Sequence, residues 1–156
     1  MRVYLIRHGQ AEDAATDAAR PLSRQGREDV TRVAGFLGLF ERPRPSRIAH
    51  SGKLRARQTA EMFAEAWQVD DVCEMPDLLP GSDPAAWASR LASLDDDVAL
   101  VGHLPHMGRL AGLMLCGDAD REVAQLQAAS VICLARSGRG WTELWHLHPQ
   151  LFYGAD

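Results

Sequence analysis

The chain opens with Met1-Arg2-Val3-Tyr4-Leu5-Ile6-Arg7-His8-Gly9, and this stretch decides the fold. Residues 3–6 are aliphatic or aromatic without polar alternation, which is typical of a strand buried on both faces of an α/β sheet. The run ends at Arg7 and His8, just before Gly9. Because ligands of open α/β sheets bind beyond the carboxyl ends of strands, His8 is a candidate functional residue.

The alternation of strand and helix continues along the chain. Further short apolar segments predict strands at residues 48–51, 72–75 and 98–101, and apolar residues at helical spacing predict helices over 23–40, 54–67, 84–93 and 107–116. Segments 131–135 and 141–147 flank a turn-rich loop at 137–140 and predict a closing hairpin. We therefore expect an α/β fold with a mainly parallel sheet, covered by helices, and an antiparallel last pair of strands.

Size and composition favour one folded unit. The 156 residues are enough for a full hydrophobic core, and contents of 46% hydrophobic and 24% charged residues are those of a globular protein rather than a disordered one. No repeat, low-complexity tract or linker divides the chain. We expect a single domain over residues 1–156.

Charge and cysteine content restrict the partners and the compartment. A net charge of −4 argues against a basic nucleic-acid surface, and the apolar runs are too short for a signal peptide or a membrane span. Cys73, Cys116 and Cys133 are odd in number and show no C-x-x-C spacing, which favours reduced thiols. The expectation is a cytoplasmic protein that binds neither nucleic acid nor membrane.

Three segments place cations and imidazoles next to predicted strand ends. Arg7-His8-Gly9 combines a cation, an imidazole able to attack phosphorus, and a glycine that lets backbone amides approach an anion. Arg55 lies in the first turn of a predicted helix, where amides and guanidinium together favour a phosphate. His103, if protonated, can donate to phosphoryl oxygens. Each segment alone is also compatible with a structural role, but together they predict a phosphate pocket with His8 as nucleophile.

These segments resemble motifs of the histidine phosphatase superfamily, also called phosphoglycerate-mutase-like, and within it the SixA-type phosphohistidine phosphatases. The similarity is carried by Arg7-His8-Gly9-x-Ala11, Arg20-Pro21-Leu22-Ser23-x-x-Gly26, Leu54-Arg55-Ala56-x-Gln58-Thr59-x-Glu61 and His103-Leu104-Pro105. It spans at least residues 2 to 115. The resemblance implies a three-layer α/β/α sandwich.

The resemblance also implies roles for individual residues. His8 would become phosphorylated, and Arg7, Arg55 and His103 would complete the catalytic set. The candidate phosphate-binding residues are Arg7, Arg20, Ser51, Arg55, His103 and Leu104. We expect no cofactor and no metal, because arginines supply the positive charge; His146 and His148, two residues apart, lack the further ligands that a metal site needs.

The general acid and the leaving group are less well defined by the sequence. Many relatives use a glutamate from the middle segment; here Asp77 is the candidate, with a solvated or capping carboxylate as the alternative. A missing acid matters less when a phosphorus–nitrogen bond breaks, because imidazole leaves more readily than an alkoxide. Only roughly 30 residues separate the helix over 54–67 from the strand at 98–101, which leaves little material for a lid over the site.

The expected function is therefore a phosphohistidine protein phosphatase that acts on phosphorelay or phosphotransfer proteins. Two alternatives remain open at this stage. One is a phosphatase of small phosphomonoesters, and the other is an interaction module that binds phosphate without turning it over.

Overall fold

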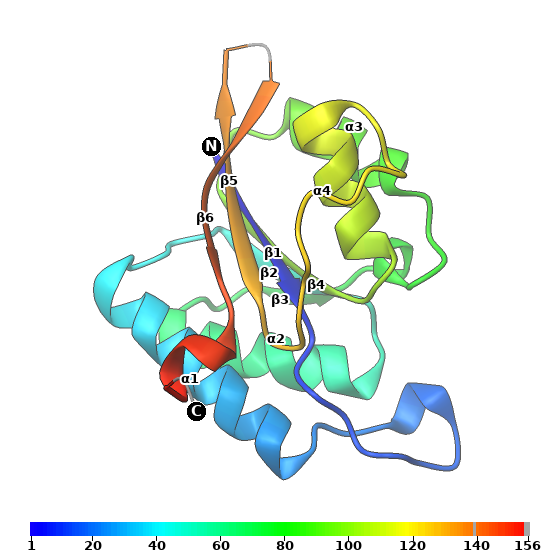
Figure 1. Ribbon diagram of the computed structural model, residues 1–156, viewed down its shortest axis with the longest axis vertical. Coiled ribbons are helices and arrows are strands. Elements are labelled where there is room, and N and C mark those ends of the chain that lie inside the picture. The colour runs from blue at the N-terminus through cyan, green and yellow to red at the C-terminus, as the bar shows by residue number, and fades with distance from the viewer. Residues whose placement is uncertain (139, 155–156) are drawn as a thin grey trace.

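The computed structural model describes residues 1–138 and 140–154; Arg139 of the predicted turn and residues 155–156 lie outside the described residues. One six-stranded sheet has the order β3-β2-β4-β1-β5-β6 (Figure 1). Its strands are β1 (Arg2–Arg7), β2 (Arg47–His50), β3 (Val72–Glu74), β4 (Val98–Gly102), β5 (Val131–Ser137) and β6 (Gly140–Leu147). Strands β1 to β4 pair in parallel, and β5 is antiparallel to both β1 and β6. The expected mainly parallel sheet with an antiparallel edge is confirmed.

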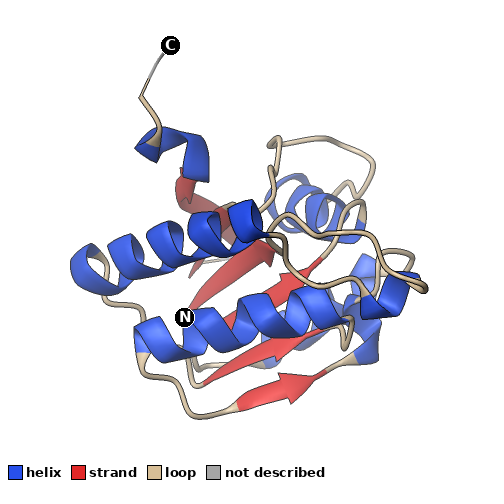
Figure 2. Cartoon of the chain, turned by 90° about the horizontal axis from the view of Figure 1, so that it is seen from below, coloured by secondary structure: helices blue, strands red, loops and turns tan. Residues whose placement is uncertain are grey.

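Helices cover both faces of the sheet, which confirms the three-layer α/β/α sandwich. Helices α1 (Arg24–Phe40) and α2 (Leu54–Trp67) lie side by side on one face (Figure 2). Helices α3 (Pro84–Ser93) and α4 (His106–Cys116) pack on the other. Three short 3-10 helices complete the fold: η1 (Asp17–Ala19), η2 (Pro76–Leu78) and η3 (Pro149–Phe152).

Residues 3–6 of strand β1 are all apolar because both faces of the strand are covered. Tyr4 and Ile6 belong to the buried cluster under α1 and α2, and Val3 and Leu5 belong to the cluster under α3 and α4. Successive side chains of a strand point to opposite faces, so a strand between two helical layers has no polar alternation. The segment that predicted the fold is thus the centre of both hydrophobic cores.

The chain between β1 and α1 folds back as a loop over residues 11–22. An isolated bridge joins Ala11 to Leu22, and Ser23 caps α1 by accepting a hydrogen bond from the Gly26 amide at 3.0 Å. A Cβ atom on Gly26 would lie 2.1 Å from the carbonyl oxygen of Gln10. This close approach is open only to glycine and fixes the start of α1 beside the residues that follow His8.

Candidate active site

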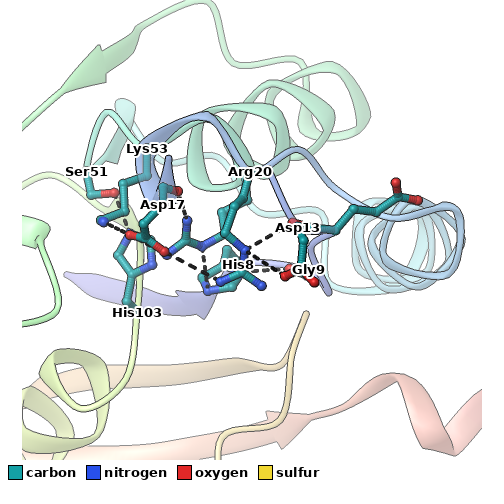
Figure 3. Close-up of polar contacts among 10 residues, drawn as sticks. His8, Gly9, Asp13, Asp17, Arg20, Ser51, Lys53 and His103 are labelled. Atoms are coloured by element: carbon teal, nitrogen blue, oxygen red, sulfur yellow. Dashed lines mark hydrogen bonds and ion pairs between the residues drawn. The ribbon is translucent and has the colours of Figure 1, made fainter. Parts of the chain in front are cut away.

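The predicted site residues converge on one edge of the sheet. His8, Ser51 and His103 each directly follow a strand: β1, β2 and β4, respectively. These three strands are parallel neighbours in the order β2-β4-β1. The carboxyl ends of parallel strands share an edge, so these side chains meet although they are far apart in the sequence. Arg55 enters from the first turn of α2, which follows β2. Figure 3 shows the side chains around His8.

The imidazole of His8 is held in one tautomer. Its Nδ1 lies 2.6 Å from the carbonyl oxygen of Gly9, and because a carbonyl only accepts, Nδ1 carries the hydrogen. The other nitrogen, Nε2, receives a hydrogen bond from Nε of Arg55 at 3.4 Å. In the neutral ring Nε2 therefore bears a lone pair that faces the cationic cluster, which is the arrangement a nucleophile needs.

The environment of His8 keeps the ring neutral. Burial is the largest cause that lowers its pKa, to about 4; the hydrogen bond to the Gly9 carbonyl opposes this, and the charges of Arg55, Arg7 and Arg20 lower the pKa further. The neighbouring cations and the burial of the ring act in the same direction. Burial contributes more to the lowered pKa of His8 than the cations do.

The low pKa of His8 predicts the response of the empty protein to acid. The unfolded chain takes up a proton on this ring near its ordinary pKa of 6.5, and the folded chain only near 4, so the stability linked to the neutral ring is present above 6.5 and is lost as the pH falls toward 4. We expect an NMR titration of the empty protein to place the His8 midpoint near 4, with the signal identified by its absence in His8→Asn. A midpoint near 6.5 contradicts the buried environment.

His103 lies beside His8 and is bonded to Ser51. The two imidazole rings have their centroids 4.8 Å apart, and Nε2 of His103 is 2.6 Å from the buried Ser51 hydroxyl. Burial, followed by the charges of His8, Arg55 and Lys53, lowers the pKa of His103 to about 3. The ring is thus neutral in the empty site. That His103 becomes protonated beside a bound phosphoryl group stays a prediction, since the negative charge of that group would have to raise the pKa of the ring.

Arg55 is the most enclosed cation of the site, with a side chain only 6% exposed. Its Nε contacts Nε2 of His8, and its Nη1 donates to the main-chain oxygen of Asp17 at 2.7 Å. Its Nη2 lies 3.3 Å and 3.4 Å from the two carboxylate oxygens of Asp17. The guanidinium is therefore held at all three nitrogens.

The other two predicted arginines are oriented by backbone carbonyls. Arg7 donates from Nη1 to the Leu126 oxygen at 2.7 Å, and its buried Nε has no partner among the residues that the structure describes. Arg20 donates from Nε to the Glu12 oxygen at 3.0 Å. Both charges act on His8, so the structure brings these arginines to the site as the motifs predict.

Leu104 and Asp77 complete the predicted set, and only Leu104 borders the site. Leu104 follows His103, is 39% exposed, and lines a pocket that Arg7 also lines. Asp77 instead accepts hydrogen bonds from Trp87 Nε1 at 2.9 Å and from Arg90 Nη2 at 2.8 Å. Its carboxylate is thus occupied by α3, and the structure gives its general-acid role no support.

Thr59 contributes to the site in a way that the sequence reasoning missed. Its buried hydroxyl accepts a hydrogen bond from the Gly9 amide at 3.1 Å and donates one to the Arg55 carbonyl at 2.8 Å. A Cβ atom on Gly9 would lie 2.9 Å from Val30, so this position also requires glycine for packing against α1. Thr59 is part of the motif Leu54-Arg55-Ala56-x-Gln58-Thr59-x-Glu61, so its place in that motif was the one feature of the sequence that pointed to a role in the site.

Asp17 and Lys53 were also missed as parts of the site. The side chain of Lys53 is only 18% exposed and is paired with Asp17. The Asp17 carboxylate lies among three cationic side chains (Figure 3). Asp17 lies in a loop, where neither hydrophobic periodicity nor motif spacing indicates which side chain turns toward the site.

Of His146 and His148, only His146 lies in β6. His148 lies beyond the end of β6 at Leu147, and its ring centroid is 6.0 Å from that of His146. Over residues 1–138 and 140–154, no group of three or more histidine, cysteine, aspartate or glutamate side chains is arranged to hold a metal ion.

Comparisons with known proteins agree with this geometry. The profile of the histidine phosphatase superfamily (branch 1) matches residues 3–79. The phosphohistidine phosphatase SixA of Escherichia coli (strain K12) is 30% identical over 155 residues, covering 96% of this chain and 94% of that protein. A structure of the protein histidine phosphatase SixA with tungstate has a TM-score of 0.87 at 24% identity, covering 97% and 99%. A structure from Agrobacterium tumefaciens that carries the SixA name has a TM-score of 0.81 at 25% identity, covering 95% and 97%.

Proposed function

This chain belongs to the histidine phosphatase superfamily, and on that premise we propose that it removes phosphoryl groups from phosphohistidine side chains of proteins. Its enzyme class is that of a phosphatase, a hydrolase of phosphoryl groups. The observation that carries the proposal is the lone pair on Nε2 of His8, which is kept unprotonated and lies against the Arg55 guanidinium.

The reaction has two steps, transfer of the phosphoryl group to His8 and its hydrolysis. Nε2 of His8 attacks phosphorus, the bond from phosphorus to the substrate nitrogen breaks, and the substrate imidazole departs as a neutral ring when its distal nitrogen carries a proton. Water then attacks the phosphoryl group on His8, the new phosphorus–nitrogen bond breaks, and inorganic phosphate leaves. The nucleophile is regenerated with its lone pair intact.

The cations act on the phosphoryl oxygens in both steps. Arg7 and Arg55 neutralise charge on these oxygens, Arg20 extends the cationic surface, and His103 donates from Nδ1, the nitrogen that Ser51 leaves free. Ser51 holds the ring of His103 through the opposite nitrogen. Arginines supply the charge that a metal ion supplies in other phosphatases, so the proposal includes no metal.

A pocket beside the site supports a protein substrate. It measures about 500 Å³ and shares Arg7 with the site. Its apolar lining residues are Leu104, Pro105, Ala119, Ala124 and Leu126. Side chains that flank a phosphohistidine fill such a space better than the polar body of a sugar phosphate does. Phosphorelay and phosphotransfer proteins, which carry phosphohistidine on their surface, are the proposed partners.

The alternatives fit the site less well. Small phosphomonoesters release an alkoxide that needs a general acid, and the carboxylate of Asp77 is bonded to Trp87 and Arg90. A binding module without turnover has no use for an imidazole whose second nitrogen is kept free of protons. A site that binds only small polar esters also gives no reason for the exposed Leu104 and the apolar pocket that it lines.

We expect the enzyme to prefer a histidine-phosphorylated protein over alkyl phosphomonoesters. Because the carboxylate of Asp77 is bonded to Trp87 and Arg90, an alkoxide leaving group should receive no proton from it. The kcat/KM for the phosphohistidine protein should then be higher by roughly 100-fold or more, the smallest contribution that a general acid usually makes. Initial rates of phosphate release in buffer with EDTA measure this ratio. A preference for the esters reverses the assignment of substrate.

The domain boundaries and the location are parts of the same proposal. A single domain over residues 1–156 is supported by the common sheet, which includes strands from β1 to β6. No helix of the described residues has the length and apolarity to cross a membrane. Cys73, Cys116 and Cys133 are free thiols, which suits a reducing compartment such as the cytoplasm.

A further inference from the structure

Asp17, which lies in none of the sequence motifs, forms ion pairs with three cationic side chains of the site. It stands in η1, within the loop over residues 11–22, and its carboxylate pairs with Lys53, with Arg55 and with Nη1 of Arg20 at 3.5 Å. Its main-chain oxygen accepts from Nη1 of Arg55 at 2.7 Å. In Figure 3 several of the dashed lines meet at Asp17.

These contacts decide which edge of the Arg55 guanidinium faces the nucleophile. Asp17 takes both terminal nitrogens, one through its main-chain oxygen and the other through its carboxylate. A guanidinium is planar and rigid, so fixing Nη1 and Nη2 also fixes the direction of Nε. The remaining nitrogen is the one that lies 3.4 Å from Nε2 of His8.

We propose that Asp17 is a positioning residue for the phosphatase reaction, which holds Arg55 with its Nε edge toward His8. The inference rests on the proposed function, because it assigns Arg55 to the reacting phosphoryl group. Asp17 itself touches neither the nucleophile nor, in this role, the substrate.

The charge of Asp17 serves the same role. The hydrogen bond from Lys53, followed by the charges of Arg55 and Lys53 acting against partial burial, lowers the pKa of Asp17 to about 2, so the carboxylate is ionised at neutral pH. Arg55 is nearly enclosed, and an enclosed cation without a paired anion is strongly disfavoured. Asp17 thus stabilises Arg55 in its working orientation before a phosphoryl group arrives.

Kinetics of two Asp17 variants test the inference. Asp17→Ala should lower kcat by about 10- to 100-fold with little change in KM, since a misplaced catalytic group costs up to about 100-fold in rate. Asp17→Asn should lose less, because its amide oxygen still accepts from Nη2, although a neutral acceptor is roughly half as strong. The matched control is Asp13→Ala: Asp13 lies in the same loop, is fully exposed, and only approaches Arg20 at 3.9 Å. It should behave as the wild type.

A double-mutant cycle shows whether Asp17 acts through Arg55. In an Arg55→Ala background, single-turnover rates should show no further loss on Asp17→Ala, because its target is gone. An equal further loss, a change in KM alone, or a kcat that stays the same or rises in Asp17→Ala overturns the inference. If melting curves show that Asp17→Ala is unfolded, Asp17→Asn carries the same test.

The outcome for the wild type separates this inference from the proposed function. If wild-type protein neither releases phosphate from a histidine-phosphorylated protein nor carries a phosphoryl group on His8, the proposed function fails. If the wild type does both and Asp17→Ala matches it, only the positioning role fails.

Discussion

Replacing His8 by alanine is expected to abolish phosphatase turnover and to leave the fold intact. The variant loses the unprotonated Nε2 that lies 3.4 Å from Nε of Arg55, in a ring whose centroid is 4.8 Å from that of His103. Removal of the nucleophile in enzymes that form a covalent intermediate costs roughly 10⁶ in kcat. Initial rates with a histidine-phosphorylated protein measure the loss.

The fold should survive because the backbone of His8, not its ring, holds the strand end in place. The amide donates to the Gly102 oxygen at 3.1 Å, and the carbonyl accepts from the Ala129 amide at 3.1 Å. The ring itself bonds the adjacent Gly9 carbonyl and receives one long hydrogen bond from Arg55. His8→Asn is the matched variant, since its amide can still donate to a nearby carbonyl but cannot accept a phosphoryl group.

Trapping the intermediate completes this prediction. Wild-type protein mixed with substrate and quenched in alkaline denaturant, which preserves phosphohistidine, should carry one phosphoryl group on the peptide that contains His8. His8→Ala should carry none. Turnover by His8→Ala at a rate near that of the wild type contradicts the covalent mechanism, and a label on another residue contradicts the choice of nucleophile.

The sequence predicted the framework of the site because local signals determine it. The helix over residues 84–93 was predicted with its observed bounds, since Asp83 accepts from the Ala85 amide and Pro84 occupies the first helical position. The apolar runs at 3–6 and 98–101 predicted buried strands that the structure extends by one or two residues. Once these strands pair in parallel, His8 and His103 must share an edge.

The contacts that tune the site could not be predicted, because they join distant segments through loops. Asp17 meets Arg55 across 38 positions, and only the closed loop over residues 11–22 brings them together. Asp77 was a candidate acid in the sequence, and its engagement with Trp87 and Arg90 depends on where α3 packs. The burial that lowers the pKa of His8 is likewise a property of the assembled layers.

Arg55→Ala is expected to lower kcat by about 100- to 1,000-fold, the usual cost of removing one donor that stabilises charge in a transition state. The effect should be larger than that of removing a surface charge because Arg55 is only 6% exposed, so water replaces its charge poorly. Steady-state rates with the histidine-phosphorylated protein, together with inhibition by tungstate, separate the effect on kcat from the effect on anion binding.

Arg57→Ala is the control for the loss of one positive charge and of one arginine from helix α2. Arg57 lies two residues further along α2, is about half exposed, and pairs with Glu61 at 3.7 Å, so its loss removes the same charge without touching His8. Arg55→Lys keeps a cation but loses the rigid fork that Asp17 holds, and it should recover only part of the lost rate. Full activity in Arg55→Lys means that charge alone suffices at this position, and equal losses in Arg55→Ala and Arg57→Ala mean that the effect comes from the net charge of the helix. Only a loss confined to position 55 and poorly restored by lysine assigns the rate to the guanidinium edge that faces Nε2.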